Sequence, residues 1–198
     1  FSHKSITTDD FKSYLFEYYR KFEGGSKLLI LESVDWDAWF NKPGMPPVDI
    51  EYDQFLANKC QKLADDWLTH SMDVTPEIYN GMQTNQRVMF MDRLIQKAPV
   101  SLEILSRMDI LYQLSSSNNA EIKFKWQSLC LASGKTDIFP HVVKFITSAG
   151  RMKYVRPLYR ALSGISDEGR TLARKTFLEN RSFYHPICEA MVSKDLGV

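Results

Sequence analysis

The sequence contains few residues whose types and spacing could carry out a reaction. Its four histidines are His3, His70, His141 and His185, and none has another histidine four residues further on. A zinc site on one helix needs two imidazoles one turn apart, usually as His-Glu-x-x-His. The chain therefore predicts no metal site of its own, and we interpret His70 and His185 as structural residues.

Nucleophilic chemistry has no recognisable motif either, so we predict no catalytic residue. Gly-x-Ser-x-Gly and glycine-rich phosphate loops are both absent from the sequence. Cys60 and Cys130 lie inside apolar helical patterns, and we interpret them as buried hydrophobic side chains. With Cys188 the count is odd and there is no Cys-x-x-Cys, which argues against a disulfide framework. We expect a reducing compartment, the cytoplasm.

A local excess of positive charge is the most informative feature of the sequence. Residues 144–175 include eight basic and two acidic residues, whereas residues 9–77 include fourteen acidic and seven basic ones. The basic residues are Lys144, Arg151, Lys153, Arg156, Arg160, Arg170, Arg174 and Lys175. One interpretation is a solvated face with salt bridges to the acidic part of the chain. The other is that some of these residues bind an anion.

The string Gly150-Arg151-Met152-Lys153 favours the second interpretation for two of these residues. Gly150 is expected to close one helix, and the next helix begins within a few residues. Arg151 and Lys153 then lie at a helix N-terminus, where free amides and the helix dipole attract anions. A guanidinium can hold a carboxylate through two parallel hydrogen bonds, and an ammonium adds a second charge.

Short helices are expected to position these residues. Beyond residue 84 the apolar residues follow a 3.6-residue period, with helix starts mostly 17 or 18 residues apart. The expected starts are Thr84, Ser101, Asn118, Thr136, a position near Lys153, and Ser166. Asn118 and Glu121 approximate a capping box, and Pro140 and Pro157 fit the first turns of their helices.

The first part of the chain predicts further helices and one boundary. Thr7-Thr8-Asp9-Asp10 starts a helix that ends at Gly24-Gly25-Ser26, and residues 34–40 form a short helix. Residues 28–31 fit either a strand or a helical turn. Pro43-Gly44-Met45-Pro46-Pro47 cannot continue a helix, so we interpret it as a linker. A long helix follows over residues 52–69.

These elements predict an all-α fold. Successive short helices with short loops stack as antiparallel pairs, so we expect an irregular two-layer α-solenoid. This would be a right-handed superhelix of the HEAT or armadillo type.

The composition excludes several classes of protein. The chain has 198 residues, 44% of them hydrophobic, and a formal net charge of +1. Intrinsic disorder and a dedicated nucleic-acid binder are both disfavoured by these values. The sequence contains no apolar run long enough to span a membrane, so we expect no membrane partner. Because the chain has no initiator Met, we expect it to be part of a longer protein.

Several strings, in order, resemble the end of leukotriene-A4 hydrolase and its aminopeptidase B relatives. They are Phe1-Ser2 with Lys4-Ser5-Ile6-Thr7-Thr8-Asp9-Asp10, Val34-Asp35-Trp36, Pro43-Gly44-Met45-Pro46-Pro47, Ile122-Lys123-Phe124-Lys125-Trp126, Gly150-Arg151-Met152-Lys153-Tyr154-Val155-Arg156-Pro157-Leu158-Tyr159, His185-Pro186 and Lys194-Asp195-Leu196. The family consists of zinc aminopeptidases with an N-terminal β domain, a thermolysin-like catalytic domain and a C-terminal helical domain.

The resemblance implies a division of the chain. Residues 1–42 would be the tail of the catalytic domain, residues 43–51 a proline-rich linker, and residues 52–198 the C-terminal helical domain. Its partners would be the catalytic and N-terminal domains of the same enzyme. Zinc would be held by the parent enzyme and not by this chain, which is not expected to be active alone.

The resemblance also implies roles for two residues. Arg151 would bind the substrate carboxylate in the active-site cleft, and Lys153 would assist it. The carboxylate could belong to a peptide or to a fatty acid, so the parent enzyme could also be an epoxide hydrolase. The alternative that we keep is a stand-alone helical-repeat module that binds a protein partner.

Overall fold

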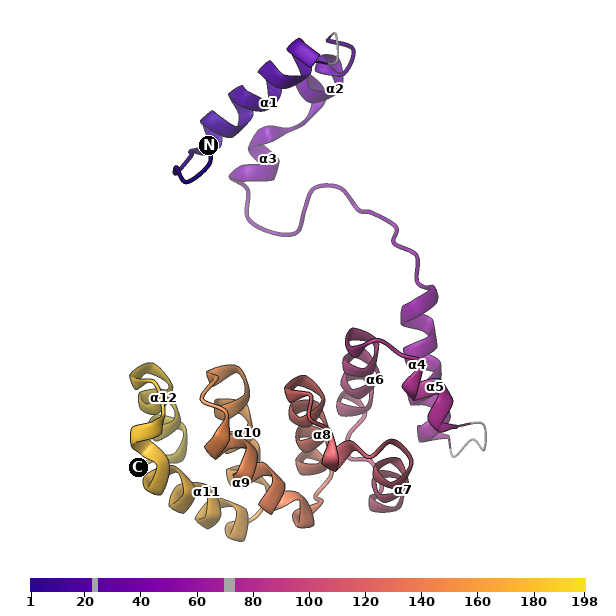
Figure 1. Ribbon diagram of the computed structural model, residues 1–198, viewed down its shortest axis with the longest axis vertical. Coiled ribbons are helices and arrows are strands. Elements are labelled where there is room, and N and C mark those ends of the chain that lie inside the picture. The colour runs from indigo at the N-terminus through magenta and orange to yellow at the C-terminus, as the bar shows by residue number, and fades with distance from the viewer. Residues whose placement is uncertain (23–24, 70–73) are drawn as a thin grey trace. The chain divides into compact units, whose positions relative to one another are not determined.

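The computed structural model describes residues 1–22, 25–69 and 74–198, and within these ranges every regular element is a helix (Figure 1). The all-α prediction is therefore confirmed. The chain divides into two compact units, Phe1–Tyr52 and Asp53–Val198. Among the described residues no helix has the length and apolar character needed to cross a membrane. His70 lies outside the described residues, so its predicted structural role is not addressed.

The first unit consists of three helices, α1 (Thr8–Phe22), α2 (Leu28–Ser33) and α3 (Trp36–Phe40). The predicted helix start is confirmed, because the Thr7 hydroxyl accepts the amide of Asp10 at 3.2 Å. The Asp10 carboxylate in turn accepts the amide of Thr7 at 2.9 Å, which completes a reciprocal cap. The segment that the sequence left undecided, residues 28–31, is helical.

The second unit contains the remaining helices. They are α4 (Phe55–Leu68), α5 (Pro76–Asn80), α6 (Thr84–Gln96), α7 (Leu102–Tyr112), η1 (Leu114–Ser116), α8 (Ala120–Ala132), η2 (Thr136–Ile138), α9 (Phe139–Ser148), α10 (Met152–Ile165), α11 (Asp167–Asn180), η3 (Arg181–Phe183) and α12 (Pro186–Leu196). The even-numbered helices pack in sequence, α4 on α6, α6 on α8, α8 on α10 and α10 on α12. On the other side α5 contacts α7, and α9 contacts α11, so the unit has two rows of helices (Figure 1).

Helix caps account for several of the helix starts. Ser101 accepts the amide of Ile104 at 3.3 Å, and Ser166 accepts the amide of Gly169 at 3.0 Å, as the pattern predicts. The capping box predicted at Asn118 is wrong, because the N-cap of α8 is the next residue, Asn119. The helix expected at Thr136 opens as a single 3-10 turn, since α9 begins only at Phe139.

The sequence predicts that Pro140 and Pro157 lie in the first turns of their helices, and the first prediction is confirmed while the second is wrong. Pro140 is the second residue of α9, where its missing N–H has no cost. Pro157 is not in a first turn: it lies inside α10, six residues into the helix. An interior proline costs about 3 kcal/mol or more. The buried face of α10 compensates, because it includes Tyr154, Val155 and Leu158.

The core of the second unit is apolar and contains paired aromatic side chains. Trp67 on α4 donates its indole N–H to the Tyr112 hydroxyl at 3.0 Å, so both polar atoms are satisfied where they are buried. Cys60 and Cys130 are completely buried free thiols, and burial raises the pKa of both. This confirms their interpretation as buried core side chains.

One buried hydroxyl connects three helical segments. Tyr184 lies between η3 and α12, and its hydroxyl donates to the Ile146 carbonyl of α9 at 3.0 Å. The same oxygen lies 2.9 Å from the Tyr159 hydroxyl of α10. Both tyrosines are buried, which raises the pKa of each phenol. A single oxygen atom therefore satisfies two otherwise isolated polar groups.

We expect Tyr184→Phe to lower the free energy of unfolding by about 2 kcal/mol or more, because it leaves a buried carbonyl and a buried hydroxyl without partners. Tyr159→Phe is the matched variant, and it removes one hydrogen bond while Tyr184 still contacts Ile146. Its cost should be smaller, about 1 kcal/mol. Urea unfolding followed by circular dichroism measures both, and equal costs would contradict this role of Tyr184.

Candidate functional site

The two cations singled out by the sequence lie at the start of α10. Ala149 and Gly150 join α9 to α10, and Arg151 is the N-cap residue of the new helix. Lys153 follows as its second residue, and both side chains are exposed. The predicted placement of Arg151 and Lys153 at a helix N-terminus is therefore observed.

The backbone at this helix start is open to an acceptor. The carbonyl of Arg151 accepts the amides of Tyr154 at 2.9 Å and Val155 at 3.1 Å, and the Arg151 side chain caps no amide. Within the described part of the chain, the amides of Met152 and Lys153 have no hydrogen-bond partner. Free N–H groups at a helix N-terminus attract negative charge.

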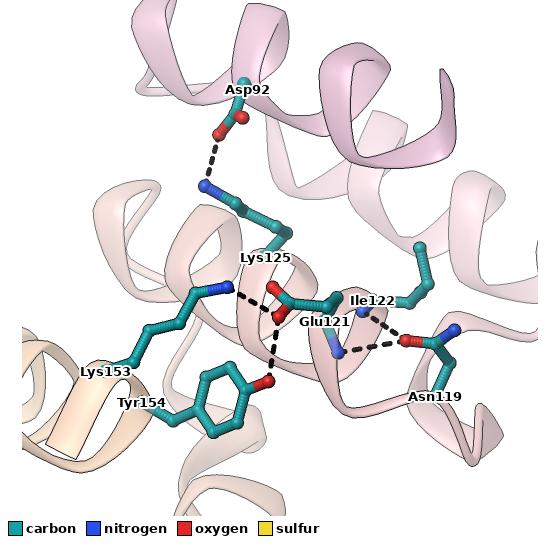
Figure 2. Close-up of polar contacts among 7 residues, drawn as sticks. All are labelled: Asp92, Asn119, Glu121, Ile122, Lys125, Lys153 and Tyr154. Carbon is teal, nitrogen blue, oxygen red and sulfur yellow. Dashed lines mark hydrogen bonds and ion pairs between the residues drawn. The ribbon is translucent and has the colours of Figure 1, made fainter. Parts of the chain in front are cut away.

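Lys153 forms an ion pair that the sequence did not predict. Its ammonium lies 2.5 Å from Oε1 of Glu121 on α8, and the Tyr154 hydroxyl donates to the same oxygen at 2.8 Å. Figure 2 shows the two donors approaching one carboxylate from α10. The side chains remain partly exposed, 47% for Lys153 and 30% for Glu121. The starts of α8 and α10 therefore lie side by side.

The position of Glu121 corrects its predicted role. The capping box expected there would turn the Glu121 side chain back to its own helix start, but the structure turns it toward α10 (Figure 2). The cap of α8 is supplied by Asn119, whose Oδ1 accepts the amides of Glu121 at 3.0 Å and Ile122 at 3.4 Å. Sequence spacing missed the contact because thirty-two residues separate Glu121 from Lys153.

Arg151 has a different environment from Lys153. Its guanidinium carbon lies 5.7 Å from the centre of the Tyr154 ring, and the Lys153 ammonium lies 5.5 Å from the same ring. These distances are within the range of cation–π contacts. No ion pair of Arg151 is found among the described residues. With Lys153 paired to Glu121, Arg151 carries the uncompensated positive charge.

Three other residues of the basic segment, Arg156, Arg170 and Lys175, have local ion-pair partners. Arg156 forms a two-point pair with Asp195 of α12, at 2.6 and 3.1 Å. That hydrogen bonding holds the pKa of the Asp195 carboxyl below its ordinary value. Arg170 and Lys175 pair with Asp167 and Glu179 on their own helix. The expected salt bridges to the acidic residues 9–77 are not found for this segment in the described ranges; its partners come from residues 121–195.

No donor set for a metal is present in the described part of the chain, since it contains no group of three or more His, Cys, Asp or Glu side chains that could hold an ion. His185 caps α12, and its Nδ1 accepts the amide of Ile187 at 3.3 Å. The predicted structural role of His185 is therefore observed.

The pKa of the Glu121 carboxyl reflects its contacts with Lys153 and Tyr154. The hydrogen bond from Lys153, and then that from Tyr154, holds this pKa below its ordinary value of 4.5. Because the pKa of Glu121 is lower in the folded than in the unfolded state, ionised Glu121 stabilises the folded protein at pH values above its unfolded-state pKa. This stabilisation is lost as the pH falls through the folded-state pKa of Glu121.

We expect Lys153→Met to raise the pKa of Glu121 toward its ordinary value, with the Tyr154 hydrogen bond keeping part of the decrease. A carbon-13 titration of the side-chain carboxyl between about pH 2 and pH 7 measures the shift. Asp92→Asn removes a neighbouring ion pair, that with Lys125 at 2.6 Å, and should leave the Glu121 pKa unchanged. An unchanged Glu121 pKa in Lys153→Met would contradict the ion pair.

Comparison with known proteins identifies the family. The sequence family described as leukotriene A4 hydrolase, C-terminal, matches residues 82–196 of this chain. Leukotriene A-4 hydrolase of Xenopus laevis is 36% identical over 202 aligned residues, covering 100% of this chain and 32% of that protein. Leucine aminopeptidase 2 of Sclerotinia sclerotiorum is also 36% identical, covering 98% of this chain and 31% of that protein.

Solved structures agree with these relatives. Native yeast LTA4 hydrolase matches with a TM-score of 0.79 and 32% identity over 98% of this chain and 33% of that one. The chain thus spans about a third of the length of the proteins it matches. It belongs to the leukotriene A4 hydrolase family, to whose C-terminal domain its residues 82–196 correspond.

Proposed function

We propose that this chain is the C-terminal part of a leukotriene-A4-hydrolase-like zinc aminopeptidase, and that Arg151 and Lys153 bind the substrate carboxylate. Family membership and relatives about three times as long support the first part. The observation that carries the second part is the exposed, uncompensated guanidinium of Arg151 at the open N-terminus of α10.

The charges at this helix start favour a ligand over a purely structural role. Cations near a helix N-terminus oppose the helix dipole, and each costs about 0.3–1 kcal/mol when exposed. Arg151 and Lys153 both occupy such positions in α10. An anion bound by the free amides of Met152 and Lys153 and by the Arg151 fork would offset that cost.

This geometry supports a carboxylate as the proposed ligand. A carboxylate fits a guanidinium through two parallel hydrogen bonds, whether it ends a peptide or a fatty acid. Holding that end fixes the rest of the substrate against the reacting groups of another domain, which is catalysis by orientation. Zinc and the general acid and base would come from the catalytic domain, since the described residues supply no donor set for the metal.

The boundary between the two compact units, at Tyr52 and Asp53, supports the proposed division of the chain. Residues 1–42 would complete the catalytic domain, residues 43–51 would be the linker, and residues 52–198 the helical domain. The two rows of helices in the second unit favour the right-handed HEAT- or armadillo-like superhelix. The three unpaired thiols favour the cytoplasm as the compartment.

The first unit carries surface that fits packing against a larger domain. None of its residues with described exposure is buried, although it is rich in large apolar side chains. The exposed ones include Phe1, Tyr14, Leu29, Ile30, Trp39 and Phe40. Exposed apolar groups this dense are typical of an interface. We propose that the catalytic domain covers them.

We expect Arg151→Ala in the full-length enzyme to lower kcat/KM for short peptides about 10- to 100-fold, because a charge-assisted hydrogen bond contributes roughly 1.5–3 kcal/mol. Arg160→Ala is the matched control, since Arg160 is an exposed arginine on the same helix. The zinc content should remain unchanged in both variants. Near-normal peptide kinetics in Arg151→Ala would overturn the assignment.

We also expect the isolated chain to exchange the amides of α1 much faster than those of α10, because α1 lacks buried contacts. Hydrogen–deuterium exchange with mass spectrometry measures both helices. Joined to the preceding domains, α1 should become protected while α10 changes little. Equal protection of α1 and α10 in the isolated chain would argue against the proposed packing.

A further inference from the structure

Glu121 is held in place by a buried anchor as well as by the Lys153 ammonium. Tyr154 is 7% exposed, and its ring lies 5.4 Å from that of Phe124 and 5.5 Å from that of Phe145, measured between ring centroids. Its hydroxyl is therefore fixed by packing, and it donates to the same Glu121 oxygen that Lys153 contacts. A core contact thus determines where the carboxylate lies, and the carboxylate determines where the ammonium lies (Figure 2).

The cluster also has a defined charge. Arg151 and Lys153 contribute two positive charges at the start of α10, and Glu121 contributes one negative charge beside them. The result is a site of net +1, with the protein's own carboxylate already on Lys153. A substrate carboxylate that approaches Lys153 also approaches Glu121, so that it is repelled by one charge while it is attracted by two.

We propose that Glu121 is a positioning residue that acts through Lys153 and sets the charge of the anion site to that of one uncompensated cation. This inference rests on the proposed function, in which the site binds the substrate carboxylate. Glu121 contacts neither the substrate nor the metal in this account. It fixes the Lys153 ammonium and attenuates its attraction for the substrate, so that affinity depends mainly on Arg151.

The test is a set of four full-length enzymes: wild type, Glu121→Gln, Lys153→Met and the double variant. Gln is isosteric with Glu and retains an oxygen that can accept from Tyr154. The substrates are a tripeptide with a free C-terminal carboxylate and the same tripeptide as its C-terminal amide. Steady-state kinetics gives KM and kcat for each combination, and thermal unfolding verifies that each variant is folded.

The expected order follows from the charges. For the free acid, Glu121→Gln should lower KM about three- to tenfold and Lys153→Met should raise it by about as much, since charges a few ångströms apart at a protein surface interact on that scale. The double variant restores the net charge of +1, so its KM should return to within about threefold of wild type. For the amide, KM should be nearly the same in all four enzymes, and kcat should change little throughout.

A matched control removes a similar ion pair from the same helix. Lys125 of α8 pairs with Asp92 of α6 at 2.6 Å, one turn from Glu121, and does not contact Lys153 (Figure 2). Asp92→Asn should leave the KM of both substrates unchanged. A loss that arises only from weakened packing of α8 would appear in Asp92→Asn and would affect acid and amide alike.

The outcomes separate this inference from the proposed function. A KM of the double variant that stays more than about threefold away from that of wild type, or an equal effect on acid and amide, would overturn the role of Glu121. If Arg151→Ala abolishes the preference for the acid while Glu121→Gln leaves KM unchanged, only this inference fails. If Arg151→Ala leaves the preference for the acid intact, the proposed carboxylate site itself fails.

Discussion

The burial of one face of α10 is the constraint on which the second unit depends. Tyr154, Val155, Leu158, Tyr159 and Leu162 are buried on that face, and α10 packs against α8, α9, α11 and α12. Burying each large side chain contributes about 1.5–3 kcal/mol, which together exceeds the cost of an interior proline. This packing on four neighbouring helices determines the position of α10, and with it the position of the first turn that carries Arg151 and Lys153.

Electrostatics at the start of α10 follows from the stacking of helices in one row. Glu121 lies in the first turn of α8, where the helix dipole interacts favourably with its negative charge. Arg151 and Lys153 are positive charges at the start of α10, where the helix dipole interacts unfavourably with them. The pair between Glu121 and Lys153 relieves part of that opposition. Local ion pairs also engage Arg156, Arg170 and Lys175 of the basic segment. At the start of α10, Arg151 is the cation for which no ion pair is found in the described part of the chain.

The two units differ in how their apolar residues are used. The second unit buries two tryptophans and several tyrosines and phenylalanines in its own core. The indole N–H groups of Trp67 and Trp126 donate to the hydroxyls of Tyr112 and Ser115. The first unit has aromatic contacts on its surface, such as the stacked rings of Trp36 and Phe40 with centroids 5.6 Å apart, but no buried residue among those described. A stable core needs elements on more than one side, and three short helices supply too little surface. This difference agrees with relatives three times as long.

The sequence by itself determined the all-helical fold, most helix starts and the position of Arg151 and Lys153 at a helix N-terminus. These are local properties, set by apolar periodicity and by caps such as Thr7, Ser101 and Ser166. Only the tertiary structure decided that Pro157 lies inside α10 and that Glu121 faces Lys153. Both depend on packing between segments far apart in the chain. The N-termini of α8 and α10 lie side by side because the two helices pack in one row. No local pattern in the sequence predicts that contact.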